Sequence, residues 1–143
     1  MTTNLQDLHG IWRLARFEEL RNGAWVPAID ADAHGCISYW PNGRMHVLIG
    51  GGQRPRLRGE WAQVPAQQKA LCLDDLVAYA GSYTVEDDRV RHLVDTCWIP
   101  NWEGRELVRA VSFPARGVLQ LDTVPDPSGR VRATQRVTWE RYP

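Results

Sequence analysis

A histidine and an arginine, His92 and Arg109, are the side chains in this sequence best suited to acid–base chemistry. An imidazole can move a proton near neutral pH, and a guanidinium held away from water stabilises developing negative charge. Tyr83 carries a phenol that can donate a hydrogen bond to a carbonyl oxygen. We therefore predict a catalytic group in which His92 shuttles a proton while Arg109 and Tyr83 polarise a carbonyl.

Each of these residues also has a purely structural interpretation. His92 can be a packing residue whose ring is hydrogen-bonded to Tyr83 or Arg109, and Arg109 can belong to an internal polar network. A tyrosine hydroxyl in a protein core is commonly tied to the backbone. The residue types alone leave both interpretations open.

The elements that must position these residues are strands, because apolar and polar residues alternate with a period of two along most of the chain. Turns rich in Gly, Pro and Asp separate the alternating segments. Eight or nine short strands at this spacing predict an all-β sandwich or barrel. One segment, residues 65–77, instead predicts a short helix placed as a lid or plug. The expected strands cover residues 11–19, 35–40, 44–49, 57–61, 81–85, 90–98, 106–113, 118–123 and 131–141.

Alternate residues of a strand in a closed sheet face inward, so each strand has two files of side chains, one facing the interior and one facing solvent. Choosing the inward file of each strand predicts the lining of the barrel. The less charged file of 90–98 contains His92, and the bulkier file of 106–113 contains Arg109. No carboxylate lies on the inner files, so an anionic or carbonyl-bearing ligand, water or a phenol must satisfy that arginine. Seven tryptophans in 143 residues also indicate a cavity lined by aromatic faces. The expected ligand-binding residues are Tyr79, Met45, Thr96, Trp98, Trp102, Trp61 and Gln135.

Composition excludes several classes of partner. The 143 residues form one expected domain, and 17 basic side chains balance 17 acidic ones, which argues against nucleic acid and anionic membranes. No apolar run approaches the roughly 20 residues of a membrane span. The first ten residues carry no export signal, which predicts a cytoplasmic protein with reduced cysteines. Histidine spacing predicts no metal site, and the absence of a glycine-rich phosphate loop predicts no nucleotide cofactor.

Several motifs resemble the bacterial and fungal lipocalin-like domain family. Gly10-Ile11-Trp12 is similar to the lipocalin G-x-W signature, with Arg141 able to pack over Trp12. The more specific resemblance lies in the central stretch, where the family typically has a GrM-type hairpin followed by aYaGtYtv, H, nPnw.G and vR. The matching residues here are 43–45, 78–85, His92, 100–104 and 107–109. The resemblance implies a single antiparallel up-and-down barrel, usually intracellular, with a cavity for a ligand.

Members of this family resemble carriers in some settings and biosynthetic tailoring enzymes in others. We predict a cofactor-independent enzyme of the cyclase, isomerase or dehydratase type, acting on a hydrophobic, aromatic or polyketide-like substrate. Trp98, where the family usually has a smaller residue, would narrow the cavity and favour a planar molecule. The alternative is a non-catalytic carrier or sensor of a small hydrophobic ligand, and either protein would be a monomer or a homodimer.

Overall fold

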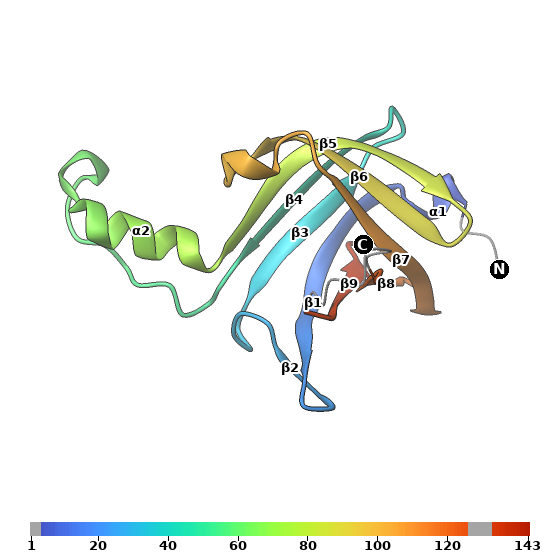
Figure 1. The fold of residues 1–143 in the computed structure, drawn as a ribbon, viewed down its shortest axis with the longest axis horizontal. Coiled ribbons are helices and arrows are strands. Elements are labelled where there is room, and N and C mark those ends of the chain that lie inside the picture. The colour runs from blue at the N-terminus through green and yellow to red at the C-terminus, as the bar shows by residue number, and fades with distance from the viewer. Residues whose placement is uncertain (1–3, 126–132) are drawn as a thin grey trace.

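The computed structural model describes residues 4–125 and 133–143, and the strands in this part of the chain form one closed antiparallel barrel (Figure 1). Each barrel strand pairs with its neighbour in the order β1-β3-β4-β5-β6-β7-β8-β9, and β9 pairs with β1 to close eight strands. The remaining strand, β2, lies outside the barrel and pairs with the C-terminal end of β1. The strands are β1 (Gly10–Arg21), β2 (Ala24–Pro27), β3 (His34–Tyr39), β4 (Arg44–Gly50), β5 (Leu76–Glu86), β6 (Arg89–Cys97), β7 (Glu106–Ala115), β8 (Val118–Thr123) and β9 (Gln135–Arg141).

The predicted all-β barrel with about eight or nine strands is confirmed, with differences in detail. The helix expected over 65–77 is α2 (Ala66–Asp74), and α1 (Leu5–Leu8) adds a helical turn at the start. Residues 57–61 form no strand, and β2 was not expected. Two short 3-10 helices, η1 (Trp61–Gln63) and η2 (Pro100–Trp102), complete the elements. Residues 131 and 132 of the last expected strand lie outside the described residues.

The pairing of β5 with β6 contains a bulge that changes which residues face inward. The register shifts between Ala80 and Gly81, so that Ala80 pairs with Thr96 while Gly81 pairs with Val94. A Cβ atom on Gly81 would overlap the carbonyl oxygen of Leu93, so only glycine permits this close approach of the strands. The extra residue reverses the alternation at the end of β6.

One end of the barrel is closed by the first residues of the chain. The indole nitrogen of Trp12 donates a hydrogen bond to the carbonyl oxygen of Leu8 at 2.9 Å. The guanidinium of Arg141 lies 4.1 Å from the Trp12 ring centroid and also donates to the carbonyl oxygen of Asp7. This contact joins the first and last barrel strands to α1, and Leu8 and Trp12 are both fully buried beneath it.

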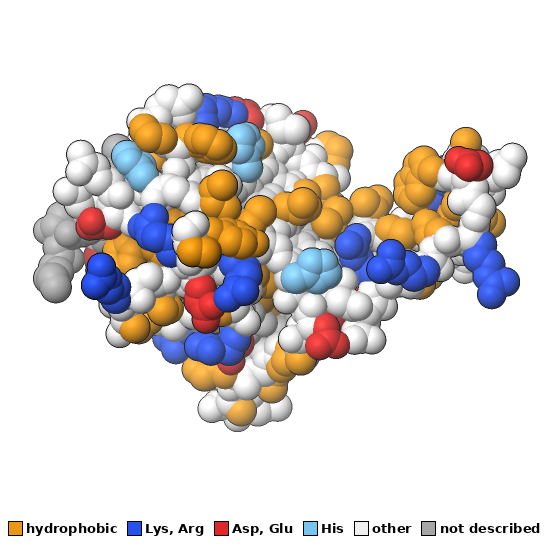
Figure 2. Space-filling view, turned by 180° about the vertical axis from the view of Figure 1, so that it is seen from behind, with side chains coloured by type: hydrophobic (Ala, Val, Ile, Leu, Met, Phe, Trp, Pro, Cys, Tyr) orange, Lys and Arg blue, Asp and Glu red, His pale blue; other side chains and the backbone are white. Residues whose placement is uncertain are grey.

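An arm formed by residues 51–75 projects sideways from the other end of the barrel (Figure 1). The arm carries η1 and α2, and neither helix contains a buried residue. Leu71, Leu73 and Trp61 are exposed along it. Figure 2 shows hydrophobic side chains continuing from the barrel wall onto the arm, next to several basic ones. The helix therefore does not act as a plug or lid in this structure, which corrects the expected placement. None of the helices in the described residues has the length and apolar character needed to cross a membrane.

Candidate functional site

A histidine held between two tyrosines lies at the centre of the barrel. His92, on β6, is 1% exposed. Its Nε2 atom is 2.7 Å from the hydroxyl of Tyr39 on β3, and its Nδ1 atom is 2.8 Å from the hydroxyl of Tyr79 on β5. The three residues, which we call the Tyr–His–Tyr triad, come from three strands within the consecutive run β3-β4-β5-β6 of the sheet. Both ring nitrogens of the imidazole are occupied by phenols.

All three groups of the triad are neutral near pH 7. Burial, and secondarily the positive charge of Arg109, lowers the pKa of His92 to about 3. Burial raises the pKa of Tyr79 to about 12, although the charge of Arg109 opposes this shift. Burial likewise raises the pKa of Tyr39 well above its usual value. The triad therefore supplies neutral hydrogen-bonding groups and no imidazole that titrates near neutral pH.

Tyr83 lies beside the triad but outside its hydrogen bonds. Its ring packs edge-on against Tyr39 with centroids 4.8 Å apart, and its hydroxyl donates to the carbonyl oxygen of Trp40 at 2.9 Å. The expected partner of His92 is thus replaced by Tyr39 and Tyr79. Tyr39 was missed by the sequence analysis, although it occupies the same file as Ile37 in an alternating segment.

A partly open cavity of about 840 Å³ lies along β6, β7, the end of β8 and the start of β9. Leu107, which pairs directly with His92, lines this cavity, whereas the three residues of the triad are not part of its lining. Arg109 also lines it, partly buried, and donates a hydrogen bond to the carbonyl oxygen of Val108 at 2.9 Å. The described lining consists of Arg89, Arg91, Trp102, Arg105, Glu106, Leu107, Val108, Arg109, Thr123, Val124, Pro125, Ala133 and Gln135.

The charged groups of the cavity are predominantly basic. Four arginines and one carboxylate line it, and the carboxylate of Glu106 is 3.4 Å from the guanidinium of Arg91. Within 4–125 and 133–143, no carboxylate lies at ion-pair distance from Arg109 or Arg105. A cavity with this lining favours a ligand that combines an apolar body with a negatively charged or electron-rich oxygen.

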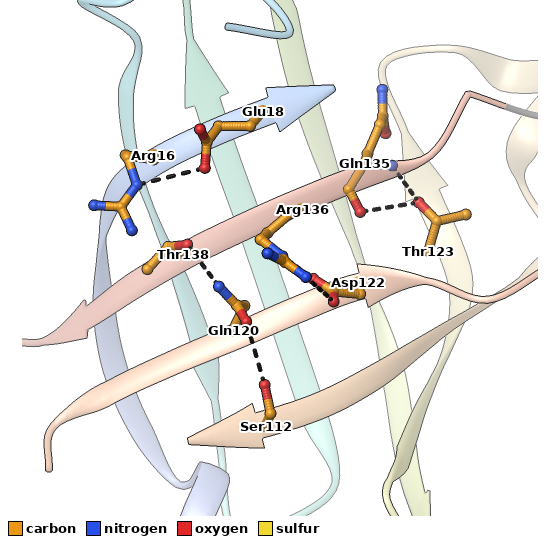
Figure 3. A network of polar contacts seen from close by, with 9 residues as sticks. All are labelled: Arg16, Glu18, Ser112, Gln120, Asp122, Thr123, Gln135, Arg136 and Thr138. Atoms are coloured by element: carbon orange, nitrogen blue, oxygen red, sulfur yellow. Dashed lines mark hydrogen bonds and ion pairs between the residues drawn. The ribbon is translucent and has the colours of Figure 1, made fainter. Parts of the chain in front are cut away.

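Two aromatic or polar residues of the expected ligand-binding set lie at the cavity. Trp102 lines it and packs edge-on against Trp98, with ring centroids 5.3 Å apart. Gln135 also lines it and is fixed through its main chain, whose N–H donates to Thr123 Oγ1 at 3.0 Å. Figure 3 shows the amide side chain of Gln135 directed away from Thr123, and its contact with a ligand stays a prediction.

The structure places three other expected residues away from the cavity. Thr96 is exposed opposite Ala80, because the bulge at Gly81 reverses the end of β6, and Cys97 takes the inward position opposite Tyr79 instead. Trp61 is 59% exposed on the arm, where Lys69 lies 4.9 Å from its ring centroid. Their expected orientation toward the interior is therefore wrong. Met45 does face inward, but it is fully buried in the core cluster.

Nothing in the described residues groups three or more histidine, cysteine or acidic side chains as metal ligands. The two nitrogens of His92 are committed to phenols, and the cysteines at positions 36, 72 and 97 are unpaired thiols in this part of the chain. The chemistry that the site offers is therefore hydrogen bonding by phenols and electrostatic attraction by a guanidinium.

Comparison with protein families gives a match to the lipocalin-like domain over residues 9–142. The chain belongs to the lipocalin-like domain family. The resemblance of its motifs to this family is thereby confirmed, and the match spans every strand of the barrel. A search for similar curated proteins gives no match. A lipocalin-like barrel with a cavity of this size fits the binding of a small hydrophobic ligand.

Proposed function

We propose that this lipocalin-like protein binds a small, largely apolar molecule in its barrel as a carrier or sensor. The observation that carries the proposal is the cavity of about 840 Å³, which falls within the size range of small-molecule sites. Apolar groups such as Leu107 and Trp102 supply contact area, while Arg109 and Gln135 supply a few polar contacts. The neutral, fully occupied His92 supports binding over proton transfer by its imidazole.

A titration with the neutral dye N-phenyl-1-naphthylamine tests this proposal, because its fluorescence rises in an apolar site. We expect saturable binding of one dye per chain. The variant Gln135→Trp, which places a bulky ring in the cavity lining, should weaken binding at least about tenfold, whereas Leu48→Trp on the exposed outer wall should not. Circular dichroism of both variants checks that the barrel is folded. Absence of saturable binding, or equal effects of the two variants, would contradict the proposal.

A second candidate function is an enzyme of the isomerase, cyclase or dehydratase type that works without a cofactor. The observation that favours it is the triad itself, because a carrier of apolar ligands does not require a buried network of two phenols and an imidazole. Tyr79 and Arg109 would polarise a substrate carbonyl and stabilise the enolate that forms when solvent removes an adjacent proton. In this reading Tyr79 takes the role predicted for Tyr83, and His92 positions Tyr79.

Deuterium exchange distinguishes the two candidates. The ketone 2-tetralone loses its α-proton to solvent and regains a deuteron from D2O, which mass spectrometry detects. An enzyme of this type would accelerate the exchange, and Tyr79→Phe would abolish the acceleration while Tyr142→Phe, at an exposed position, would not. A carrier would bind the dye and leave the exchange rate at its background value.

A further inference from the structure

The Tyr–His–Tyr triad carries one more proton than its hydrogen bonds use. Two phenols and one neutral imidazole hold three exchangeable protons, yet the triad contains two hydrogen bonds. One phenol must therefore donate to His92 and the other must accept from it. The accepting phenol keeps an O–H group that points elsewhere. Over the stretches of chain that the structure describes, neither hydroxyl contacts another acceptor.

Burial decides which phenol keeps the unused proton. Tyr39 is 1% exposed, and an unpaired hydroxyl there would lose its hydrogen bond to water without replacement. Tyr79 is less completely buried than Tyr39, so an unused hydroxyl proton costs less there. The favoured arrangement has Tyr39 donating to Nε2 of His92 and the Nδ1–H group of His92 donating to Tyr79. The hydroxyl of Tyr79 is then left as a donor.

Arg109 lies on the same face of the sheet as His92. On β7, Arg109 pairs with Val90 and Leu107 pairs with His92, so Arg109 and His92 are diagonal neighbours on one face of the sheet. The positive charge of Arg109 accordingly acts on both His92 and Tyr79. No carboxylate of the described chain neutralises that charge.

We propose that the Tyr79 hydroxyl and the Arg109 guanidinium together bind the carboxylate of an amphipathic ligand whose apolar body fills the barrel. This inference rests on the proposed binding function and names the class of molecule that the site takes. A carboxylate oxygen accepts from both groups at once, and the surrounding arginines raise its local concentration. His92 acts as a positioning residue, because its Nδ1–H group fixes the orientation of the Tyr79 hydroxyl.

The first test is the tautomer of His92, measured by long-range ¹H–¹⁵N correlation on the uniformly ¹⁵N-labelled protein. We expect a neutral ring protonated at Nδ1. A ring protonated at Nε2 would mean that the Tyr79 hydroxyl donates its hydrogen bond to His92 and has no proton left for a ligand. That result would overturn the inference whatever the protein binds. This readout needs no ligand.

The second test compares two ligands of equal shape by displacement of N-phenyl-1-naphthylamine at neutral pH. The carboxylate 2-naphthoate should bind at least about tenfold more tightly than 2-naphthalenemethanol. Tyr79→Phe and Arg109→Gln should each reduce this preference several-fold, whereas the exposed changes Tyr142→Phe and Arg13→Gln should preserve it. Dye binding itself should survive in all four variants.

The outcomes separate the inference from the proposed function. Equal affinities for the two ligands, with normal dye binding, would overturn the carboxylate site and leave the binding barrel intact. A preference for 2-naphthoate that persists in both Tyr79→Phe and Arg109→Gln would also overturn it. A protein that binds neither the dye nor either ligand would contradict both statements.

Discussion

A histidine between two phenols explains the unusual protonation behaviour expected at the centre of this barrel. His92 is fully buried, and its neutral ring makes one hydrogen bond with each neighbouring tyrosine. Charging the ring would require an imidazolium in an apolar interior, close to the cation of Arg109. The residue thus stabilises the fold only while it is neutral, and this has a measurable consequence.

Acidification should destabilise the protein through this residue. The pKa of His92 is lowered from 6.5 to about 3 on folding, so between these values the unfolded chain binds a proton that the folded chain does not. The free energy of unfolding therefore falls as the pH falls through this window. At about pH 4.5 the contribution of His92 should amount to about 2 to 3 kcal/mol.

Urea unfolding of the wild type and of His92→Gln at neutral pH and near pH 4.5 measures this contribution. Glutamine can hydrogen-bond both tyrosines but does not titrate, so its stability should fall less on acidification. Parallel losses in the two proteins would show that other groups cause the acid sensitivity.

Removal of the buried donor of the triad should also be costly. Tyr39→Phe leaves Nε2 of His92 without a partner in the core, which should lower the free energy of unfolding by about 1 to 3 kcal/mol. The same change at the exposed Tyr142 should have an effect below about 0.5 kcal/mol. Chemical denaturation of both variants makes the comparison, and equal small effects would mean that the Tyr39–His92 hydrogen bond adds nothing.

The bulge between β5 and β6 determines which side chains enter the barrel. Gly81 allows the backbone of Leu93 to approach closely, and the register shift next to it sends Thr96 outward and Cys97 inward. Between the bulge and the β5–β6 turn the simple alternation holds, which is why His92 and Tyr83 face the interior as predicted. A strict period of two cannot anticipate an inserted residue. The predicted orientations in β6 are therefore wrong from the point where this strand passes Gly81, as for Thr96.

Substitution of Gly81 tests this role of the bulge. Gly81→Ala places a methyl group against backbone that cannot move without breaking the sheet, so we expect a loss of several kcal/mol or failure to fold. Gly59→Ala, on the arm with open space around it, should cost only about 1 kcal/mol despite its positive φ of 82°. Thermal unfolding compares them, and similar small losses would contradict the steric account.

At the scale of the whole molecule, the barrel follows from sequence pattern but the hydrogen bonds of the triad do not. Alternation and turn residues predict the strands, and the G-x-W motif predicts the Trp12–Arg141 contact that the structure contains. The hydrogen bonds of Tyr39 and Tyr79 to His92 depend on how side chains of β3, β5 and β6 converge on one face of the curved sheet, which no local spacing encodes. The projection of the arm away from the barrel could not be predicted either, because its tryptophan and leucines are residue types typical of a buried segment.

The arm should be the least protected part of the molecule. Its helices bury no residue, and a nine-residue helix has little stability without packing. Limited trypsin digestion should therefore cut first after Arg56, Arg58 or Lys69, leaving the barrel strands intact. Mass spectrometry of the early fragments identifies the sites. Initial cleavage within the barrel, or protection of the arm, would show that the arm is packed against another surface.

A crystal structure of the protein soaked with 2-naphthoate tests the central claim most directly. We predict the naphthalene ring inside the barrel beside Leu107 and Trp102, with its carboxylate within hydrogen-bonding distance of the Tyr79 hydroxyl and the Arg109 guanidinium. A ligand found only on the outer wall, or one held inside with its carboxylate remote from both groups, would contradict the account.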